Sequence, residues 1–185
     1  MPFSYLASGS HALRQGEILA NVFELVARVP IHQTVDVGQP IAVERVDHPL
    51  VTVVSQDCDL EWDYQARQKQ VAEDKLLRHV LFCDLFTDVD IRARSNLKSD
   101  LFKRVRQNQD ERYHHFAAAP TGQTGTDLPD LYADFKVIFS LPCDFVYLLL
   151  GGGQATRKCI VPPPYLHDFA HRLYGFLGRV AIPEA

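Results

Sequence analysis

Residues 50–63 read LVTVVSQDCDLEWD and join an apolar run directly to a polar cluster. The run at 50–55 is β-branched and apolar on both faces, which predicts a strand in the interior of a sheet. The cluster at 55–59 then places a thiol between two carboxylates at the end of that strand. Because an interior strand holds its end rigidly, we expect this cluster to form a fixed turn with hydrogen-bonded carboxylates.

Further strands are predicted on both sides of this run. Their β-branched and aromatic composition gives the ranges 16–29, 41–46, 78–86, 112–119, 134–141, 144–150 and 155–161. Residues 47–49 are predicted to be the turn before the interior strand, and residues 142–143 the turn of a later hairpin. Two polar segments, 31–40 and 120–130, are predicted to be loops.

Helical patterns occur in three places. Residues 61–77 are rich in Gln, Lys and Glu and form either a helix or an excursion from the core. Residues 92–110 are a second excursion, in which Ser99-Asp100 supplies the N-cap of a helix. The clearest helix is 165–179, whose apolar residues follow the spacing of a helix that packs on one face: Leu166, Phe169, Ala170, Leu173, Phe176 and Leu177.

The order of these elements predicts the fold class. Strands come first, then an inserted helical segment, more strands and one terminal helix, which is an α+β arrangement with a mostly antiparallel sheet. A sheet of this size can curve into an SH3-like sheet or barrel on which the C-terminal helix packs. The length fits a single domain over 1–185, with 61–77 and 92–110 outside the barrel core.

Composition limits the function classes. The chain has a net charge of −4 and a pI of about 6.0, which argues against a protein that coats nucleic acid over its whole surface. Its four cysteines are widely spaced, form no CxxC pair and follow no signal peptide, so we expect reduced thiols and a cytoplasmic location. The longest apolar run is too short to span a membrane.

Cys58 is the first candidate for chemistry, with Asp57 and Asp59 beside it. A nucleophilic thiol needs a neighbouring cation to lower its pKa, and the two carboxylates act in the opposite direction. His114 is the candidate base, and at least one of Arg112, His114 and His115 is expected to approach the carboxylates. The alternative is a small buried cysteine at a strand end.

Metal binding is a second interpretation of the same cluster. Cys58 and Asp59 with either His114 or His115 would suit zinc or another transition ion. Asp57, Asp59, Glu61 and Asp63 would share one face of a continued strand and suit a divalent cation. The alternative is a solvated loop in which the carboxylates cap backbone N–H groups. The sequence identifies neither the metal nor a cofactor.

A basic stretch is the second candidate site. Residues 92–106 contain six cations opposed only by Asp100: Arg92, Arg94, Lys98, Lys103, Arg104 and Arg106. Lys103, Arg104 and Arg106 lie on the predicted helix and could contact the phosphates of a nucleic acid. The alternative is a solvated helix face that balances acidic segments elsewhere.

Several motifs resemble a family of uncharacterised bacterial proteins in which a strand runs into Ser-Gln-x-Cys-Asp-Leu. The matching segments are 53–60 (VVSQDCDL), 112–115 (RYHH), 134–137 (DFKV), 164–166 (PYL) and 179–183 (RVAIP). The resemblance covers most of 15–183 and implies no activity.

A second resemblance is to the SH3-like barrels of the PemK and MazF toxins. It rests on Gly16-Glu17-Ile18 before a loop and an apolar strand that ends in Ser. Those toxins carry an Arg-rich turn before that strand, where this chain has 47–49 and only Arg45 nearby. The resemblance implies an SH3-like fold and a toxin–antitoxin or phage-defence setting.

Two functions are therefore indicated. The first is a cytosolic binding or regulatory module whose partner is nucleic acid, through 92–106, or a protein, with no membrane involved. The alternative is a nuclease or other hydrolase, with or without a metal, that uses Asp57, Cys58 and Asp59 together with His114.

Overall fold

The structure is a computed structural model that describes residues 5–9, 12–28, 41–69, 73–95, 97–118 and 127–179. These residues form one seven-stranded sheet in the order β1-β7-β2-β3-β4-β6-β5, with every pairing antiparallel. The strands are β1 (Leu6–Ala7), β2 (Glu17–Ala27), β3 (Val43–Val53), β4 (His79–Thr87), β5 (Tyr113–Phe116), β6 (Leu131–Pro142) and β7 (Thr156–Ile160). The predicted loop at 31–40 and most of the one at 120–130 lie outside the described residues.

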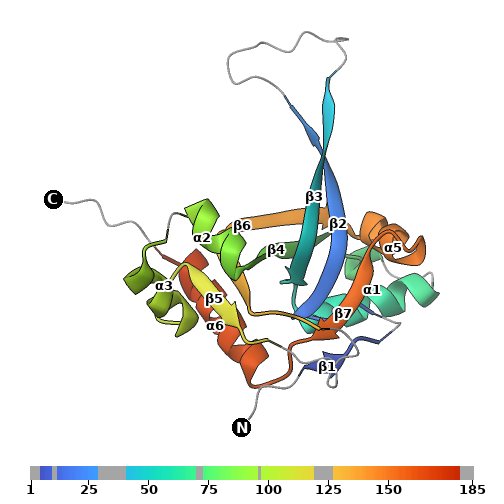
Figure 1. Cartoon of the computed structure of the whole chain (residues 1–185). Helices are drawn as coiled ribbons and strands as arrows, with labels where there is room; N and C mark the ends of the chain where they lie inside the picture. The colour runs from blue at the N-terminus through green and yellow to red at the C-terminus, as the bar shows by residue number, and fades with distance from the viewer. Residues whose placement is uncertain are drawn as a thin grey trace, which may run out of the picture.

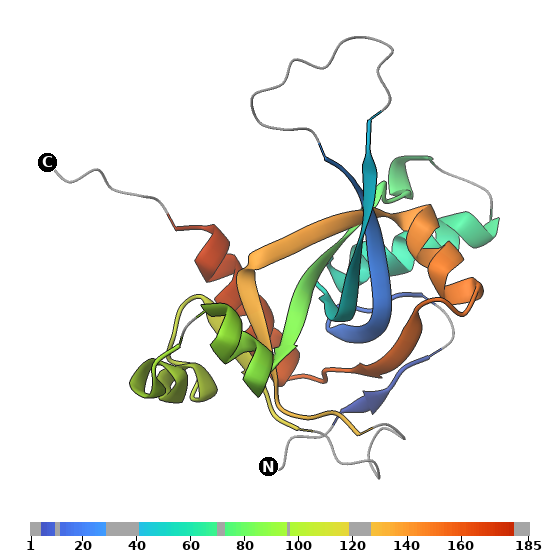
Figure 2. The same cartoon turned by 45° about the horizontal axis from the view of Figure 1, so that its top comes forward.

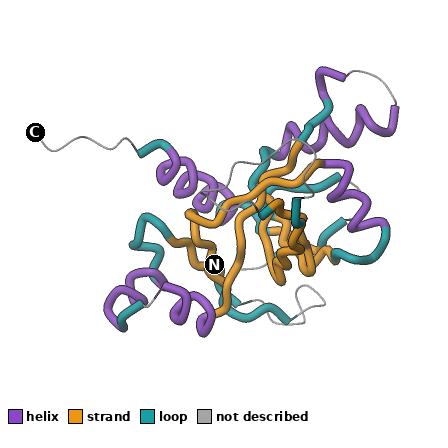
Figure 3. Tube along the Cα trace, turned by 90° about the horizontal axis from the view of Figure 1, so that it is seen from above, coloured by secondary structure: helices purple, strands orange, loops and turns teal. Residues whose placement is uncertain are grey.

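The helices stand in two groups on either side of the sheet (Figures 1 and 3). They are α1 (Asp57–Lys69), α2 (Asp88–Ser95), α3 (Ser99–Arg106), α5 (Cys143–Gly151) and α6 (Tyr165–Leu177), with a 3-10 turn η1 (Glu73–Lys75). One group holds α1 and α5, and the other holds α2, α3 and α6. The α+β class and the antiparallel sheet are confirmed.

The sheet is strongly curved but not closed (Figure 2). Its two edge strands, β1 and β5, do not pair with each other in the described part of the chain. The ends of these two edge strands nevertheless lie close together. The hydroxyl of Tyr5, just before β1, donates a hydrogen bond to the carbonyl of Ala117, just after β5, over 2.9 Å. The predicted curvature is therefore present, whereas closure into a barrel is not.

β3 runs straight through the predicted turn at 47–49, so that prediction is wrong. Its partner β2 pairs with it on both sides of Pro49, at Ala20↔Leu50 and Val22↔His48. Proline is tolerated here because β3 pairs with β4 only at 51–53. At Pro49, the edge of β3 on the β4 side therefore has no strand that needs a backbone N–H donor. Beyond this point β2 and β3 leave the sheet as a two-stranded arm (Figure 1).

The polar cluster after β3 begins a helix instead of forming a turn. Residues 57–59 are the first turn of α1, whose acidic start and basic end, Arg67 and Lys69, complement the helix dipole. Of the two alternatives for 61–77, a helix or an excursion from the core, the helix is present as far as Lys69, and it starts four residues earlier than predicted. Asp57, Asp59, Glu61 and Asp63 therefore do not line one face of a strand.

The predicted strand at 144–150 is also helical, as α5. Cys143, Val146 and Leu149 are its buried residues, at intervals of three, and they pack in a core cluster with β2, β3 and β4. A short apolar run fits a buried strand and a buried helix equally well, which is why its pattern misled the prediction.

α2 and α3 form the predicted excursion after β4. α3 buries Phe102 and Val105 against Tyr113 and Tyr132 of the sheet. Its N-cap is Lys98, with no side-chain hydrogen bond, so the predicted Ser99-Asp100 cap is wrong. No helix in the described ranges is long and apolar enough to cross a bilayer.

α6 closes one face of the sheet, as its apolar spacing predicts. Phe169 and Leu173 are buried in the core cluster that includes Ile18, Phe116 and Phe135.

Replacing Leu173, which is 1% exposed, with Ala should lower the free energy of unfolding by about 2–5 kcal/mol. The reason is the lost apolar contact together with the cavity left behind, and urea denaturation followed by circular dichroism would measure it. Tyr174→Ala on the exposed side of α6 is the control, with a change of about 0.5 kcal/mol or less. Equal effects of the two substitutions would contradict a packing role for α6.

Candidate nucleic-acid interface

The six cations of 92–106 lie on α2, α3 and the residues between them, at one side of the sheet (Figure 1). All six are exposed. Four of them form no ion pair with a described carboxylate: Arg94, Lys98, Lys103 and Arg104. The other two have only long pairs, Arg92–Asp88 at 3.8 Å and Arg106–Asp130 at 3.5 Å. The alternative in which this face is neutralised by acidic segments is therefore weakened.

The fold of α3 causes this exposure. Because Phe102 and Val105 face the core, Lys103 and Arg104 point away from it, while Arg106, one turn after Phe102, lies at the border of the buried stripe with its side chain 54% exposed. Aromatic rings hold two cations of α2 in place, since the guanidinium of Arg92 lies 4.8 Å from the Phe102 ring centre and that of Arg94 lies 5.0 Å from Phe86. The positive charges of Arg92 and Arg94 are thus exposed, while their guanidinium groups pack on aromatic rings.

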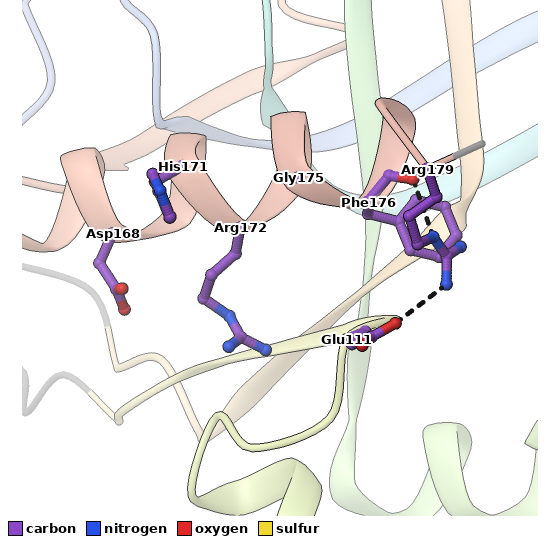
Figure 4. A pocket seen from close by; sticks show the side chains of 7 residues that line it. All are labelled: Glu111, Asp168, His171, Arg172, Gly175, Phe176 and Arg179. Atoms are coloured by element: carbon purple, nitrogen blue, oxygen red, sulfur yellow. Dashed lines mark hydrogen bonds and ion pairs between the residues drawn. The ribbon is translucent and has the colours of Figure 1, made fainter.

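A groove continues this face between the α3–β5 connection and α6. It consists of two hollows of about 450 and 440 Å³ that share Glu111 and Arg179. The first is lined by Leu97, Leu101, Arg104, Gln109, Asp110, Glu111, Arg112, Tyr113 and Arg179. The second is lined by Glu111, Asp168, His171, Arg172, Gly175, Phe176 and Arg179 (Figure 4).

Two of the groove arginines are structural. Arg172 donates to the carbonyls of Asn108 and Asp110, each over 2.5 Å, and of Tyr113 over 2.7 Å, which ties α6 to the connection. Arg112 forms two hydrogen bonds with the buried carboxylate of Asp134, and these bonds raise the pKa of Arg112. Neither guanidinium is free to bind a ligand through its main donors.

The other two arginines remain accessible. Arg104 donates to the carbonyl of Gln109 over 3.3 Å, and Arg179 lies 3.4 Å from Glu111, as the dashed line in Figure 4 shows. Both side chains are exposed. Arg104 therefore connects the α3 surface with the groove, and Arg179 extends it toward the end of α6.

Asp57 has a cationic partner, but not one of those predicted. Arg14 donates two hydrogen bonds to its carboxylate, over 2.7 and 2.5 Å, and the backbone N–H of Gln15 donates a third over 3.1 Å. These bonds, chiefly those from Arg14, lower the pKa of Asp57. The prediction of a hydrogen-bonded carboxylate is confirmed for Asp57, whereas the prediction that Arg112, His114 or His115 approaches it is wrong.

Cys58 and His114 are not brought together. The Cys58 thiol is exposed on α1, where it lies 3.7 Å from an Asp59 oxygen. His114 lies on β5, on the other side of the molecule, with its ring against Phe116 and Phe169 (Figure 1). Burial lowers the pKa of His114 to about 3, so the imidazole is neutral. The described geometry does not assemble a nucleophile and base from these residues.

The predicted metal ligands are also dispersed. Asp63 is buried and accepts hydrogen bonds from Arg67 and from the backbone of Leu77, both over 2.8 Å. His115 lies 3.2 Å from Asp130. Among the residues that the structure describes, no three His, Cys, Asp or Glu side chains are grouped to hold a metal ion.

The groove residues of α6 were missed in the sequence although a signal exists. Asp168, Arg172, Gly175 and Arg179 follow a helical spacing on the side opposite the apolar stripe. That pattern indicates a polar face, but only the structure shows which element lies against it. No family model matches this chain, and no curated protein matches it.

Proposed function

We propose that this protein is a binding module that holds a nucleic acid on the face of α2 and α3. The observation that carries the proposal is the set of exposed cations without carboxylate partners. Residues 88–106, which span α2 and α3, contain six Lys or Arg and three Asp, a local excess of three positive charges in a chain whose net charge is −4. Such a concentrated excess matches a polyanion that touches one face.

The groove supports a chain-like ligand. It runs on from Arg104 to Arg179, so a phosphate backbone that leaves the α3 surface meets a second exposed arginine, where it replaces Glu111 as the partner of Arg179. Arginine suits phosphate because its planar fork can donate two parallel hydrogen bonds. A strand of nucleic acid several nucleotides long fits this arrangement better than an isolated anion.

The biological setting belongs to the proposal as well. The resemblance to the PemK and MazF toxins favours an SH3-like sheet that works as a regulatory module in a toxin–antitoxin or phage-defence system. The free cysteines, three of them buried, fit a cytoplasmic location. The hydrolase alternative has less support, because Cys58 and His114 lie on different sides of the molecule.

The direct test is binding of fluorescent single-stranded and duplex oligonucleotides by anisotropy at several salt concentrations. If all six cations contact phosphates, the logarithm of the association constant should fall with the logarithm of salt with a slope of about −4 for a single strand. No binding to any oligonucleotide at about 50 mM salt would overturn the proposal.

A further inference from the structure

The second hollow of the groove contains a gap in the side chains of α6. Gly175 lies in its lining between His171, about one turn before it, and Arg179, about one turn after it (Figure 4). A Cβ on Gly175 would meet no atom of the described chain within 4 Å outside its own helical turn, and the backbone there has no positive φ. Glycine weakens the interior of a helix. Since neither packing nor conformation requires it here, we attribute Gly175 to the space that it keeps open in the hollow.

Arg179 presents a flat face at one end of this gap. Its guanidinium carbon lies 3.7 Å from the centre of the Phe176 ring. At that separation the guanidinium lies nearly parallel to the ring, because a nitrogen directed at the ring would come closer than van der Waals contact. The Nε donates to the carbonyl of Phe176 over 3.0 Å and so fixes the group in its plane. The ring covers one face, while the side chain remains 47% exposed, so the other face is open to the hollow.

The charges around the second hollow favour a neutral ligand. Its lining holds two carboxylates, Asp168 and Glu111, and two guanidinium groups, Arg172 and Arg179. Arg172 already donates to three backbone carbonyls. A phosphate inside this hollow would meet the carboxylates without gaining free donors from Arg172. Phosphates fit better in the first hollow, where Arg104 joins Arg179.

We propose that the second hollow binds one unpaired base of a single strand, stacked on the open face of Arg179 above Gly175. The inference rests on the proposed function and names its ligand as a single strand. Phosphates of the same strand lie on α3 and at the edge of Arg179, which is possible because Arg104 and Arg179 line one hollow. Unpaired bases commonly stack on guanidinium planes, whereas the bases of a duplex are covered by their neighbours. Every base has such a stacking face, so the hollow recognises an unpaired base and not a sequence.

Two other ligands could offer a flat ring to Arg179. An aromatic side chain of a protein partner is disfavoured, because the cations of α3 continue into the groove through Arg104 and match a polyanion. A free nucleotide carries the same base, but it would need no contact with the cations of α3. Both are included in the test.

The test compares an oligothymidine strand with a strand of equal length that lacks all its bases, by fluorescence anisotropy at one salt concentration. The two strands carry the same phosphates, so their difference in affinity measures the bases alone. The parent should bind oligothymidine more tightly by roughly tenfold, as expected for one stacked base.

Gly175→Leu fills the hollow and should abolish the difference between the two strands. The variant should fold, because the space beside Gly175 is open and leucine favours a helix more than glycine does. His167→Leu adds the same side chain at an exposed position of α6 outside the lining and should keep the difference. Arg179→Lys retains the charge but loses the flat face, so it should also abolish the difference while the salt slope stays that of the parent.

Equal affinity of the parent for the two strands would overturn this inference and leave the proposed function standing. A difference that either Gly175→Leu or Arg179→Lys retains, or that His167→Leu also loses, would overturn it as well. No binding of either strand or of a duplex would overturn the proposed function. Thymidine monophosphate bound as tightly as the strand would overturn the assignment to a strand. A tryptophan peptide that displaces oligothymidine from the parent and does not bind Gly175→Leu would overturn it in favour of a protein ligand.

Discussion

Replacing Arg112 with Ala is expected to lower the free energy of unfolding by about 3–5 kcal/mol, because it leaves a buried carboxylate without its cation. Asp134 is fully buried, and Arg112 donates to both of its oxygens, over 2.7 and 2.5 Å. The remaining bond described for this carboxylate comes from the backbone N–H of Lys136 over 3.1 Å. Denaturation in urea, followed by circular dichroism, measures the change.

Two further variants distinguish the contribution of the Arg112–Asp134 ion pair to stability from that of the groove beside it. Arg104→Ala removes an exposed cation from the same groove and should change stability by about 0.5 kcal/mol or less. Arg112→Met combined with Asp134→Leu removes both charges and should recover most of the loss, since apolar residues can replace a buried ion pair. A loss of only about 1 kcal/mol in Arg112→Ala would mean that water or another cation satisfies Asp134.

The parts of the fold that the sequence predicts correctly have strong local patterns. α6 has six apolar residues on one stripe, and β2 and β4 are rich in apolar, β-branched and aromatic residues with no interior Gly or Pro. Errors occur where two structures satisfy the same local pattern. The apolar run at 144–150 suits a strand or a helix. A proline such as Pro49 usually ends a strand, but it is tolerated where that edge of the strand is unpaired.

The features of the candidate site likewise fall into those with a local sequence pattern, which could be predicted, and those without one, which could not. The exposure of Lys103 and Arg104 follows from the buried stripe of their own helix, so the sequence predicts it. The ion pairs Arg14–Asp57 and Arg112–Asp134 join residues 43 and 22 positions apart, and only the sheet topology brings them together. Many carboxylates were available to each arginine, and nothing local selects the partner.

Removing the charges of Lys103, Arg104 and Arg106 together is expected to weaken binding of a single strand by roughly 100-fold at about 0.1 M salt. Each phosphate contact releases about 0.7 counterions from a single strand, so the salt slope should become less steep by about two. Because all three side chains are exposed on α3, the Ala variant should retain the fold of the parent. Anisotropy at several salt concentrations gives both quantities.

A charge-matched variant decides whether the effect belongs to this face or to net charge alone. Lys69, Lys75 and Arg78 are exposed near α1 and η1, on the side of the molecule away from α3 (Figure 1). Changing these three to Ala alters the net charge equally, but it should leave the salt slope unchanged, since screening confines electrostatic effects to about 10 Å at 0.1 M salt. If both triple variants lose affinity equally, the nucleic acid responds to overall charge and α3 is not its binding face. If only the α3 variant loses affinity, the contact is assigned to the exposed cations of α3.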